Sequence, residues 1–512
     1  MSTGALVFVG FMGAGKSTAA RIAAHRSGGV AIDTDALLEE QLQTSIASLF
    51  DARGEAAFRD AEEPLVLAAL ARAGTHDAVA LGGGALGSER VRAALREHTV
   101  VWLDVDVETA WSRTTSIGDR PLARDREAFA ALHEARETIY ETAADALIPA
   151  PDGGPSDALL AALDRLRSGG WPASTRLLWS SAASGSHPVW LAQGLLSGGS
   201  EPGSADGRRF LVSDETVAAL HRERVGPVAA ELLIPPGEQH KTLAQAERVW
   251  RWLAEAGATR ADTVVALGGG VVGDLAGFCA ATYQRGVAVL QVPTTLVAQV
   301  DSAFGGKTGV DLPEAKNYVG AYHLPAAVLV DPALLETLPA SERAAGYAEV
   351  VKTALIAGGP LWQQVRAGAS VDELTIQRCI RAKLAVVAAD ERDAGRRQIL
   401  NLGHTVGHAI ETVTGYARYR HGEAVALGLL AALRLSGAEA LRAEVAGLFA
   451  AQGLPTTLQG ADPDAVIAAT MRDKKRTGDR VPFVLLSEPG RPEPGHALDD
   501  AAVRAAVVEL VR

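Results

Sequence analysis

The sequence lacks a cysteine framework and long apolar segments. Only two cysteines, Cys279 and Cys379, occur in 512 residues, and their spacing fits neither a metal knuckle nor a disulfide scaffold. Its apolar stretches, such as Ala424–Leu433, are shorter than the roughly 18 residues of a membrane-spanning helix. The first residues also lack the basic start and the cleavage pattern of a signal peptide. These absences predict a folded protein of the reducing cytoplasm that is neither exported nor embedded in a membrane.

An excess of positive charge is also missing. Lys and Arg number 49 against 61 Asp and Glu, which gives a formal net charge of −12. This balance argues against a protein that binds nucleic acid through a bulk positive field. Small anionic substrates are not excluded, because local clusters of Lys and Arg can dominate a pocket.

Glycine, by contrast, is abundant. The chain contains 53 glycines, about a tenth of its residues, where about 7% is typical. Clusters of glycine predict places where the backbone approaches a ligand closely. At about 150 residues per domain, a chain of this length predicts about three domains.

Strands and helices alternate over much of the chain, which predicts parallel sheets flanked by helices. In the first part we expect strands over Ala5–Val9, Val30–Ile32, Ala78–Leu81 and Val100–Leu103, and helices over Ser17–Ser27, Ala36–Phe50 and Glu55–Ala73. The rhythm returns with strands over Thr263–Leu267 and Val287–Val292, and helical patterns dominate from Pro332 onward. We therefore predict an α/β domain over 1–167, a Ser/Gly/Pro-containing linker over 168–175, a second α/β domain over 176–331 and a mainly helical domain over 332–512.

A phosphate-binding loop lies between the first strand and the first helix. Its sequence, Gly10-Phe11-Met12-Gly13-Ala14-Gly15-Lys16-Ser17, fits the pattern G-x-x-x-x-G-K-[ST] in the strand-to-helix context that gives this motif its meaning. Backbone N–H groups at such a helix start surround phosphate. Lys16 is expected to reach the β- and γ-phosphates as a catalytic residue, and Ser17 to bind Mg²⁺. We assign to ATP the residues Gly13, Ala14, Gly15, Lys16, Ser17 and Thr18.

Two carboxylates, Asp33 and Asp35, follow the second predicted strand. Ligands of parallel α/β folds bind at this end of the strands. One carboxylate could orient Mg²⁺, for which we choose Asp33, and Asp35 could accept a hydroxyl proton. The alternative is that Asp33-Thr34-Asp35 caps the helix that starts at Ala36.

Further motifs complete a recognisable set. They are Gly54-Glu55-x-x-Phe58-Arg59, Gly82-Gly83-Gly84, Asp119-Arg120-Pro121-Leu122, and Arg136 with Tyr140. Together with the phosphate loop they resemble shikimate kinase over roughly residues 4–166. The resemblance implies that shikimate is held by Asp35, Arg59, Gly83 and Arg136, and that Arg120, on a lid, contacts ATP and offsets charge on the transferred phosphoryl group. A kinase of gluconate or of a nucleotide is the alternative substrate class.

A second glycine cluster, Gly268-Gly269-Gly270-Val271-Val272-Gly273-Asp274, follows the predicted strand Thr263–Leu267. Gly268, Gly270 and Gly273 fit G-x-G-x-x-G, a weak signal by itself. The next strand does not end in the acidic residue of a standard dinucleotide-binding unit. The cluster therefore predicts close approach to phosphate without specifying a standard nicotinamide site.

The C-terminal part carries residues suited to a catalytic metal. His404 and His408 are four residues apart and share one helix face, Glu349 and Lys352 are neighbours on another helix, and His421 follows later. One Glu with two His is a familiar zinc set with an open position. The spacing leaves open which two histidines bind, and helix packing or capping is the alternative role for any single histidine.

The order of these motifs, with Pro293-Thr294-Thr295, Gly305-Gly306-Lys307-Thr308-Gly309 and Asn401-Leu402-Gly403-His404, resembles 3-dehydroquinate synthase over roughly residues 175–490. The resemblance implies Glu349, His404 and His421 as ligands of Zn²⁺ or Co²⁺. It implies an NAD⁺ site at Pro236, Gly237, Glu238, Gln239, His240, Lys241, Gly270, Val271, Val272, Gly273, Asp274, Thr294, Thr295, Lys307, Lys316, Leu334, Leu335, Glu336 and Thr337. It implies a substrate site at Asp301, Lys307, Asn317, Lys352, Lys383, Arg397, Asn401, His408 and Lys475, with Lys352, Arg397 and His408 catalytic. Within Asp473-Lys474-Lys475, Lys474 is the alternative to Lys475.

The two resemblances imply a fold and a function for the whole chain. A P-loop kinase with a parallel sheet and flanking helices would precede a synthase made of a Rossmann-like α/β domain and a mainly α-helical domain. The kinase would phosphorylate shikimate, and the synthase would cyclise 3-deoxy-arabino-heptulosonate 7-phosphate with release of phosphate. The synthase family also implies a homodimer through that unit.

Three alternatives remain open at this stage. The C-terminal part could be a related sugar-phosphate cyclase or a metal-dependent polyol dehydrogenase. The whole chain could also be a non-catalytic nucleotide- and metal-sensing module, which would predict decayed motifs. Lys16 and Asp35 are both intact, which disfavours this last alternative.

Overall fold

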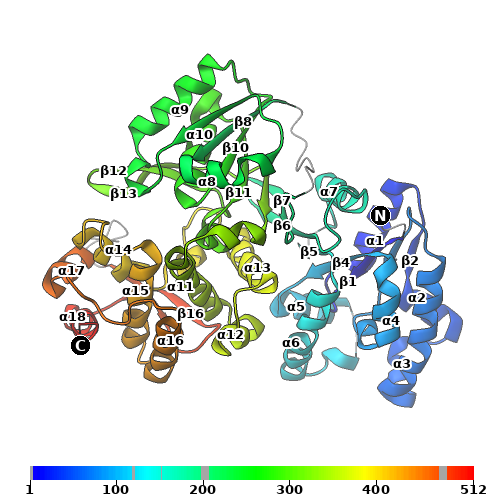
Figure 1. The fold of residues 1–512 in the computed structure, drawn as a ribbon. Coiled ribbons are helices and arrows are strands. Elements are labelled where there is room, and N and C mark those ends of the chain that lie inside the picture. Colours follow the sequence, from blue (N-terminus) through cyan, green and yellow to red (C-terminus); the bar gives the residue numbers. More distant parts are fainter. Residues whose placement is uncertain (1–3, 118–120, 151–152, 198–206, 472–480, 512) are drawn as a thin grey trace. The chain divides into compact units, whose positions relative to one another are not determined.

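The fold is that of a computed structural model, which describes residues 4–117, 121–150, 153–197, 207–471 and 481–511 (Figure 1). The chain forms two compact units, one of residues 1–180 and 188–190 and the other of residues 181–187 and 191–512. Each is described by itself. In the part of the chain that the structure describes, no helix is long and apolar enough to cross a membrane.

A parallel sheet forms the centre of the first unit. Its strands lie in the order β2-β3-β1-β4-β5-β6, and every pairing between these neighbours is parallel. The bounds are β1 Leu6–Val9, β2 Ala31–Asp33, β3 Ala78–Ala80, β4 Thr99–Asp104, β5 Ala146–Pro149 and β6 Arg176–Ala182. All four side chains of β1 are buried, as expected for a central strand covered on both faces. The predicted parallel α/β fold of this unit is confirmed.

The helices of this unit are α1 Lys16–Ser27, α2 Thr34–Leu42, α3 Ile46–Arg72, α4 Glu89–Ala94, α5 Val107–Ile117, α6 Arg126–Ala143 and α7 Asp157–Arg167. The prediction of one helix over Ala36–Phe50 is wrong. Gln43 adopts a left-handed conformation with φ 53° and ends α2, and the Ser45 side chain caps α3 by accepting from the Ser48 N–H. Gly54, with φ 76° and ψ 177°, then interrupts α3, so the segment that bears Arg59 starts in a new direction.

The second unit begins with another parallel sheet, in the order β14-β11-β10-β8-β9. The strands are β8 Arg209–Asp214, β9 Ala230–Ile234, β10 Thr263–Gly268, β11 Ala288–Pro293 and β14 Ala327–Val330, and the helices between them are α8 Glu215–His221, α9 Leu243–Glu255 and α10 Gly270–Thr282. Val264 and Ala266 of β10 pack with Val272 and Leu275 of α10 in one apolar core. This packing confirms the Rossmann-like α/β prediction.

Two antiparallel hairpins accompany this unit, and neither was predicted. The first is β12 (Lys307–Leu312) with β13 (Ala315–Tyr322), and the second is β15 (Pro482–Leu486) with β16 (Pro492–Ala497). A further strand, β7 (Gly185–Leu191), follows β6 in sheet order, and the division between the two compact units passes through both strands. The predicted boundaries at 167 and 175 remain predictions, and residues 168–175 contain no helix or strand.

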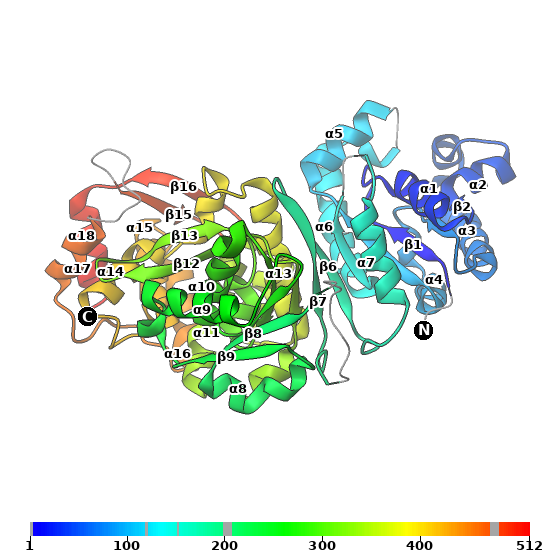
Figure 2. The same ribbon diagram turned by 90° about the horizontal axis from the view of Figure 1, so that it is seen from above.

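The rest of the unit is mainly helical, as predicted (Figure 2). Its helices are α11 Ala340–Ala357, α12 Gly359–Arg366, α13 Glu373–Ala389, α14 His404–Val413, α15 His421–Leu435, α16 Glu439–Ala451, α17 Pro463–Thr470 and α18 Asp500–Glu509. Small residues let three of them approach closely. A methyl group at Gly422 of α15 would overlap the Ala345 carbonyl of α11, and one at Gly407 of α14 would lie 3.1 Å from the Ala424 oxygen of α15. Glycine at these contacts therefore allows α11, α14 and α15 to share one site.

Candidate active sites

The phosphate loop connects β1 to α1. Gly13 and Gly15 have φ of 76° and 87°, a region that costs glycine little. Gly15 begins α1 without a side-chain cap, so the N–H groups at the helix start face the loop in the way that suits phosphate. Lys16 donates from Nζ to the Phe11 carbonyl at 3.0 Å, and Ser17 and Thr18 lie in the first turn behind it.

Asp33 and Asp35 lie at the start of α2. Asp33 Oδ1 accepts from the Asp35 N–H at 3.1 Å and from the Ala36 N–H at 3.3 Å. The structure therefore contains the capping interaction that was the alternative interpretation of this motif. The magnesium role of Asp33 remains a prediction.

The three glycines at 82–84 bring the predicted substrate residues together. A methyl group at Gly82 would lie 2.6 Å from Asp35 Oδ1. A methyl group at Gly84 would overlap the Arg59 guanidinium, and one at Gly83 would lie 3.6 Å from Arg136 Nη1. The same methyl group at Gly83 would also lie 3.6 Å from the Gly10 oxygen of the phosphate loop. Asp35, Arg59 and Arg136 thus converge on one segment beside the phosphate loop.

Two further side chains support this arrangement. Tyr140 donates its hydroxyl to the Gly83 carbonyl, and burial raises its pKa to about 12. Glu62, which the sequence analysis missed, is buried and pairs with Arg59 Nη1. Burial raises the pKa of Glu62, although the Arg59 charge opposes the shift. The signal that could have found it is its position three residues after Arg59 on the same helix.

In the second unit, Glu349, His404 and His421 come together from α11, α14 and α15. Glu349 is completely buried, and its Oε1 lies 3.5 Å from His404 Nε2 and 3.4 Å from His421 Nε2. One potential ligand atom from each of the three residues lies within 4.8 Å of the others. Both histidines present Nε2 to Glu349, while Nδ1 of His404 lies 3.3 Å from the Leu402 carbonyl. Such a partner on Nδ1 commonly orients a metal-binding histidine.

This set fits a divalent cation. The buried Glu349 carboxylate is paired on one side with Lys352, whose Nζ lies 2.5 Å from Oε2, and its other oxygen, Oε1, faces both histidine Nε2 atoms. Burial lowers the pKa of His421, but the Glu349 and Glu411 carboxylates outweigh it and raise that pKa to about 10. The surroundings therefore favour positive charge where the imidazole lies, and the nitrogen and oxygen donors suit Zn²⁺ or Co²⁺.

In a second group of the described residues, His408, Glu411 and His421, one potential ligand atom from each residue also lies within 4.8 Å of the others. The ring centres of His408 and His421 are 6.0 Å apart. His421 belongs to both groups. Its Nε2 faces Glu349 of the first group, and its Nδ1 faces Glu411 of the second. Geometry alone leaves two candidate metal positions.

The predicted substrate residues lie next to Glu349. Lys352 Nζ is 3.4 Å from Asp301 Oδ2, and Lys383 donates to Asp301 Oδ1. Burial raises the pKa of Asp301, but these two lysines outweigh it and bring that pKa to about 2. Burial lowers the pKa of Lys383. The result is a buried cluster in which the charges of Lys352 and Lys383 are balanced by Asp301 and Glu349.

The remaining predicted substrate residues occupy the surrounding segments. Arg397 is buried and donates from Nη2 to the Gly305 carbonyl at 3.0 Å. Lys307 Nζ lies 2.6 Å from Asp393 Oδ2, and Asp393 was missed by the sequence analysis. Asn317, with φ 55°, donates its N–H to Asp311 Oδ1 at 2.8 Å. Contacts from these residues to the Asp301 cluster remain predictions.

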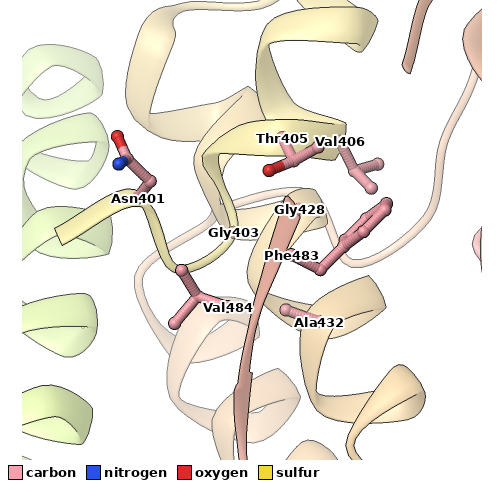
Figure 3. A pocket seen from close by; sticks show the side chains of 8 residues that line it. All are labelled: Asn401, Gly403, Thr405, Val406, Gly428, Ala432, Phe483 and Val484. Atoms are coloured by element: carbon pink, nitrogen blue, oxygen red, sulfur yellow. The ribbon is translucent and has the colours of Figure 1, made fainter. Parts of the chain in front are cut away.

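Asn401 borders a small pocket between α14, α15 and β15 (Figure 3). The pocket is lined by Asn401, Gly403, Thr405, Val406, Gly428, Ala432, Phe483 and Val484. Its volume of about 10 Å³ is near the lower limit for a single water molecule. It is too small to receive a sugar phosphate, so we do not assign it to the substrate.

Four of the predicted nucleotide residues, Glu238, Lys241, Asp274 and Lys316, form a charged cluster of their own. Lys241 Nζ lies 2.8 Å from Asp274 Oδ2 and 3.6 Å from Glu238 Oε1, and Lys316 Nζ lies 3.6 Å from the same Glu238 oxygen. α10 begins at Gly270 without a side-chain cap, which leaves its first N–H groups suited to phosphate. The structure thus joins the 236–241 loop, the start of α10 and β13, although they are far apart in the sequence.

The other predicted nucleotide residues are less closely tied to this cluster. Val272 is buried beside Gly268, Thr294 is buried, and Thr295 Oγ1 accepts from the Ala298 N–H at 3.3 Å. Leu334–Thr337 lies in a short 3₁₀ helix, where Thr337 pairs with His221 at 2.8 Å. The remaining positions, Pro236, Gly237, Gln239 and His240, line the loop after β9. Arg120 and Lys475 lie outside the described residues.

Comparisons with known proteins follow the same division of the chain. Residues 12–166 match the shikimate kinase family, residues 231–345 match 3-dehydroquinate synthase N-terminal, and residues 346–476 match 3-dehydroquinate synthase C-terminal. A 3-dehydroquinate synthase of Halorhodospira halophila is 47% identical over 341 residues, which cover 62% of this chain and 94% of that protein.

Solved structures of two other synthases resemble the second unit. A 2-deoxy-scyllo-inosose synthase complexed with carbaglucose-6-phosphate, NAD⁺ and Co²⁺ has 26% identity and a TM-score of 0.60, over 65% of this chain and 100% of that one. A 2-epi-5-epi-valiolone synthase from Streptomyces hygroscopicus, with NAD⁺ and Zn²⁺ bound, has 25% identity and a TM-score of 0.59, over 65% of this chain and 98% of that one.

Proposed function

The chain joins a member of the shikimate kinase family to a member of the 3-dehydroquinate synthase family, and from that premise we propose that it is a bifunctional shikimate-pathway enzyme. The kinase transfers phosphate from ATP with Mg²⁺ to shikimate. The synthase converts 3-deoxy-arabino-heptulosonate 7-phosphate to 3-dehydroquinate and phosphate with NAD⁺ and Zn²⁺ or Co²⁺. The main support for the synthase activity is that the predicted metal, nucleotide and substrate residues converge in one unit.

In the kinase, the glycine segment places the acceptor against the phosphate loop. Arg59 and Arg136 present guanidinium groups that suit the shikimate carboxylate, and Asp35 accepts or orients the proton of the attacking hydroxyl. Lys16 and the N–H groups at the start of α1 offset the charge of the transferred phosphoryl group. The Glu62 carboxylate holds Arg59 so that its guanidinium lies over Gly84.

In the synthase, the residues of this chain bind, orient and move protons. Glu349, His404 and His421 hold the divalent cation, and Glu238, Lys241, Asp274 and Lys316 lie around the NAD⁺ site. Lys352 and Lys383 offset the charge of the substrate, and His408 is positioned on α14 to transfer a proton. When bound, NAD⁺ supplies reversible hydride transfer and the metal supplies Lewis acidity toward the substrate hydroxyls.

The glycine segment of the kinase gives a sharp test of substrate binding. Gly84→Ala is expected to displace the Arg59 guanidinium, because the added methyl group overlaps it while the flexible end of Arg59 can move aside. Loss of one charge-assisted contact of about 1.5–3 kcal/mol lowers kcat/KM for shikimate by roughly 10–150-fold. The measurement is steady-state kinetics with shikimate varied at saturating ATP.

Gly87→Ala is the matched control, because nothing lies within 4 Å of a methyl group at that position. It should leave kcat/KM for shikimate within about twofold, and the Gly87 variant should melt at the temperature of the unsubstituted chain. If the Gly84 variant and the unsubstituted chain had the same kcat/KM for shikimate, Arg59 would not be part of the shikimate site.

Two assays test the proposal as a whole. The intact chain should form ADP when shikimate is added to MgATP, and it should release phosphate from the heptulosonate phosphate without net formation of NADH. Net NADH from a polyol, with no phosphate released, would identify the second unit as a dehydrogenase. ADP formation with gluconate or a nucleotide but not with shikimate would reassign the kinase.

We also propose a homodimer through the synthase unit and a cytoplasmic location. The support is the homodimer implied by the synthase family and the scarcity of cysteine in the chain. The net charge of −12 argues against nucleic acid as a partner, whereas local clusters of Lys and Arg are compatible with small anionic substrates. Analytical ultracentrifugation of the intact chain should give twice the mass of one chain, and a single-chain mass at micromolar concentration would refute the dimer.

A further inference from the structure

We propose that Glu411 is a positioning residue that fixes the metal-facing nitrogen of His421 and is itself anchored by Lys316 of the nucleotide cluster. The inference rests on the proposed function, because it takes Glu349, His404 and His421 as the metal ligands. Its consequence is that a residue of the NAD⁺ site tunes the affinity of the metal site. Glu411 is absent from the residues that the sequence singled out.

The position of Glu411 follows from the periodicity of α14. His404, His408 and Glu411 are spaced four and three residues apart, so all three lie on one helix face. The Glu411 side chain is 2% exposed. A buried carboxylate is costly unless it is paired, and Glu411 is paired on both of its oxygens.

The first oxygen faces His421. Oε2 lies 3.4 Å from His421 Nδ1, while the opposite ring nitrogen, Nε2, lies 3.4 Å from Glu349 Oε1. When a metal ion occupies the set, the His421 imidazole carries one N–H, and an ionised carboxylate can only accept. A proton on Nδ1 that is donated to Glu411 therefore leaves the Nε2 lone pair directed at the metal set.

The second oxygen faces the nucleotide cluster. Lys316 Nζ donates to Glu411 Oε1 at 3.1 Å, and the same ammonium lies 4.4 Å from the centre of the Tyr416 ring. Figures 1 and 2 both place the β12–β13 hairpin beside α14, which is how Lys316 of β13 reaches this helix. Glu238, Lys316, Glu411, His421 and Glu349 thus form an unbroken series of charged and polar contacts.

The two metal-binding histidines are therefore oriented in different ways. Nδ1 of His404 lies 3.3 Å from the backbone carbonyl of Leu402, which no side-chain substitution removes. Nδ1 of His421 depends on a side chain that also binds Lys316. His421 therefore offers a route by which the nucleotide site can act on the metal, and any such coupling is reciprocal.

The experiment titrates the full-length chain with Zn²⁺ against a chromogenic chelator, without NAD⁺ or substrate. Glu411→Gln is expected to weaken Zn²⁺ binding about 10–100-fold, the usual effect of losing a partner of a ligating histidine, while one Zn²⁺ per chain still binds at high concentration. Glu411→Asp, which keeps the charge, should recover part of this loss. The control is Glu444→Gln, which removes a carboxylate that pairs with Arg366 at 2.9 Å and should leave Zn²⁺ affinity unchanged.

Lys316→Met tests the anchoring. As a single substitution, it is expected to weaken Zn²⁺ binding several-fold. In the Glu411→Gln variant it should have no further effect, because Lys316 acts on the metal site only through its contact with Glu411. Equal effects in both backgrounds would overturn the anchoring role. Unchanged Zn²⁺ affinity in both Glu411 variants would overturn the positioning role. Complete loss of Zn²⁺ binding in Glu411→Gln would also overturn it, because Glu411 would then be a direct ligand. If the unchanged chain bound no Zn²⁺, the proposed function itself would fail.

Discussion

Replacing Lys16 with Ala is expected to lower shikimate phosphorylation by about 10²–10³-fold and to leave dehydroquinate formation within about twofold of its normal rate. The magnitude is that of removing one group that stabilises charge in a transition state. Lys16 lies at the first position of α1, with its Nζ folded over the phosphate loop. The residues proposed for cyclisation belong to the other compact unit.

Both activities should be measured on the same preparation of this variant. Arg72→Ala is the matched control, because it removes a positive charge from an exposed position on α3 of the same unit. It should leave both activities within about twofold. Loss of both activities in the Lys16 variant would contradict two independent sites.

Replacing Glu349 with Gln is expected to remove the bound Zn²⁺ or Co²⁺ and to lower phosphate release from the heptulosonate phosphate by more than about 10³-fold, while shikimate phosphorylation is unchanged. The carboxylate is the point where both histidine Nε2 atoms converge, and its charge is part of what binds a divalent cation. The metal content of the purified chain, determined by elemental analysis, is the direct measurement.

Glu342→Gln provides the control for this change on the same helix. Glu342 is exposed and pairs with Arg420 at 2.7 Å, and exposed pairs contribute little to stability. It should keep one metal ion per chain and full activity. If the Glu349 variant also kept one metal ion per chain, the metal would have to lie at the other group, His408, Glu411 and His421.

The fold could be predicted from the sequence where local pattern and tertiary structure agree. The strands at the centre of each sheet are short and apolar, and the structure places them within one or two residues of the prediction. The break between α2 and α3 was missed because a helical pattern continues through it, and Gln43 has no strong preference for the left-handed conformation that it adopts. The β12–β13 hairpin was also missed, because the glycines of Gly305-Gly306-Lys307-Thr308-Gly309 favour a ligand-binding loop over a strand.

The candidate sites could be predicted only in part, for a physical reason. Motifs identify residues whose spacing is local, such as the phosphate loop or His404 and His408. The partners that orient them come from other elements. Glu411 contacts a histidine ten positions later and a lysine 95 positions earlier. Asp393 contacts Lys307, which lies 86 positions earlier in the sequence. Such pairs can be identified only in the folded chain.

The central claim is that one chain carries a metal-dependent cyclase and an independent kinase, and a chelator tests it most directly. The intact chain is treated with a strong chelator, both activities are measured, and Mg²⁺ and then Zn²⁺ are added back. We predict that both activities stop, that Mg²⁺ alone restores only ADP formation with shikimate, and that Zn²⁺ then restores phosphate release from the heptulosonate phosphate. Full cyclisation in the chelated chain, or its recovery with Mg²⁺ alone, would contradict the metal centre proposed at Glu349, His404 and His421.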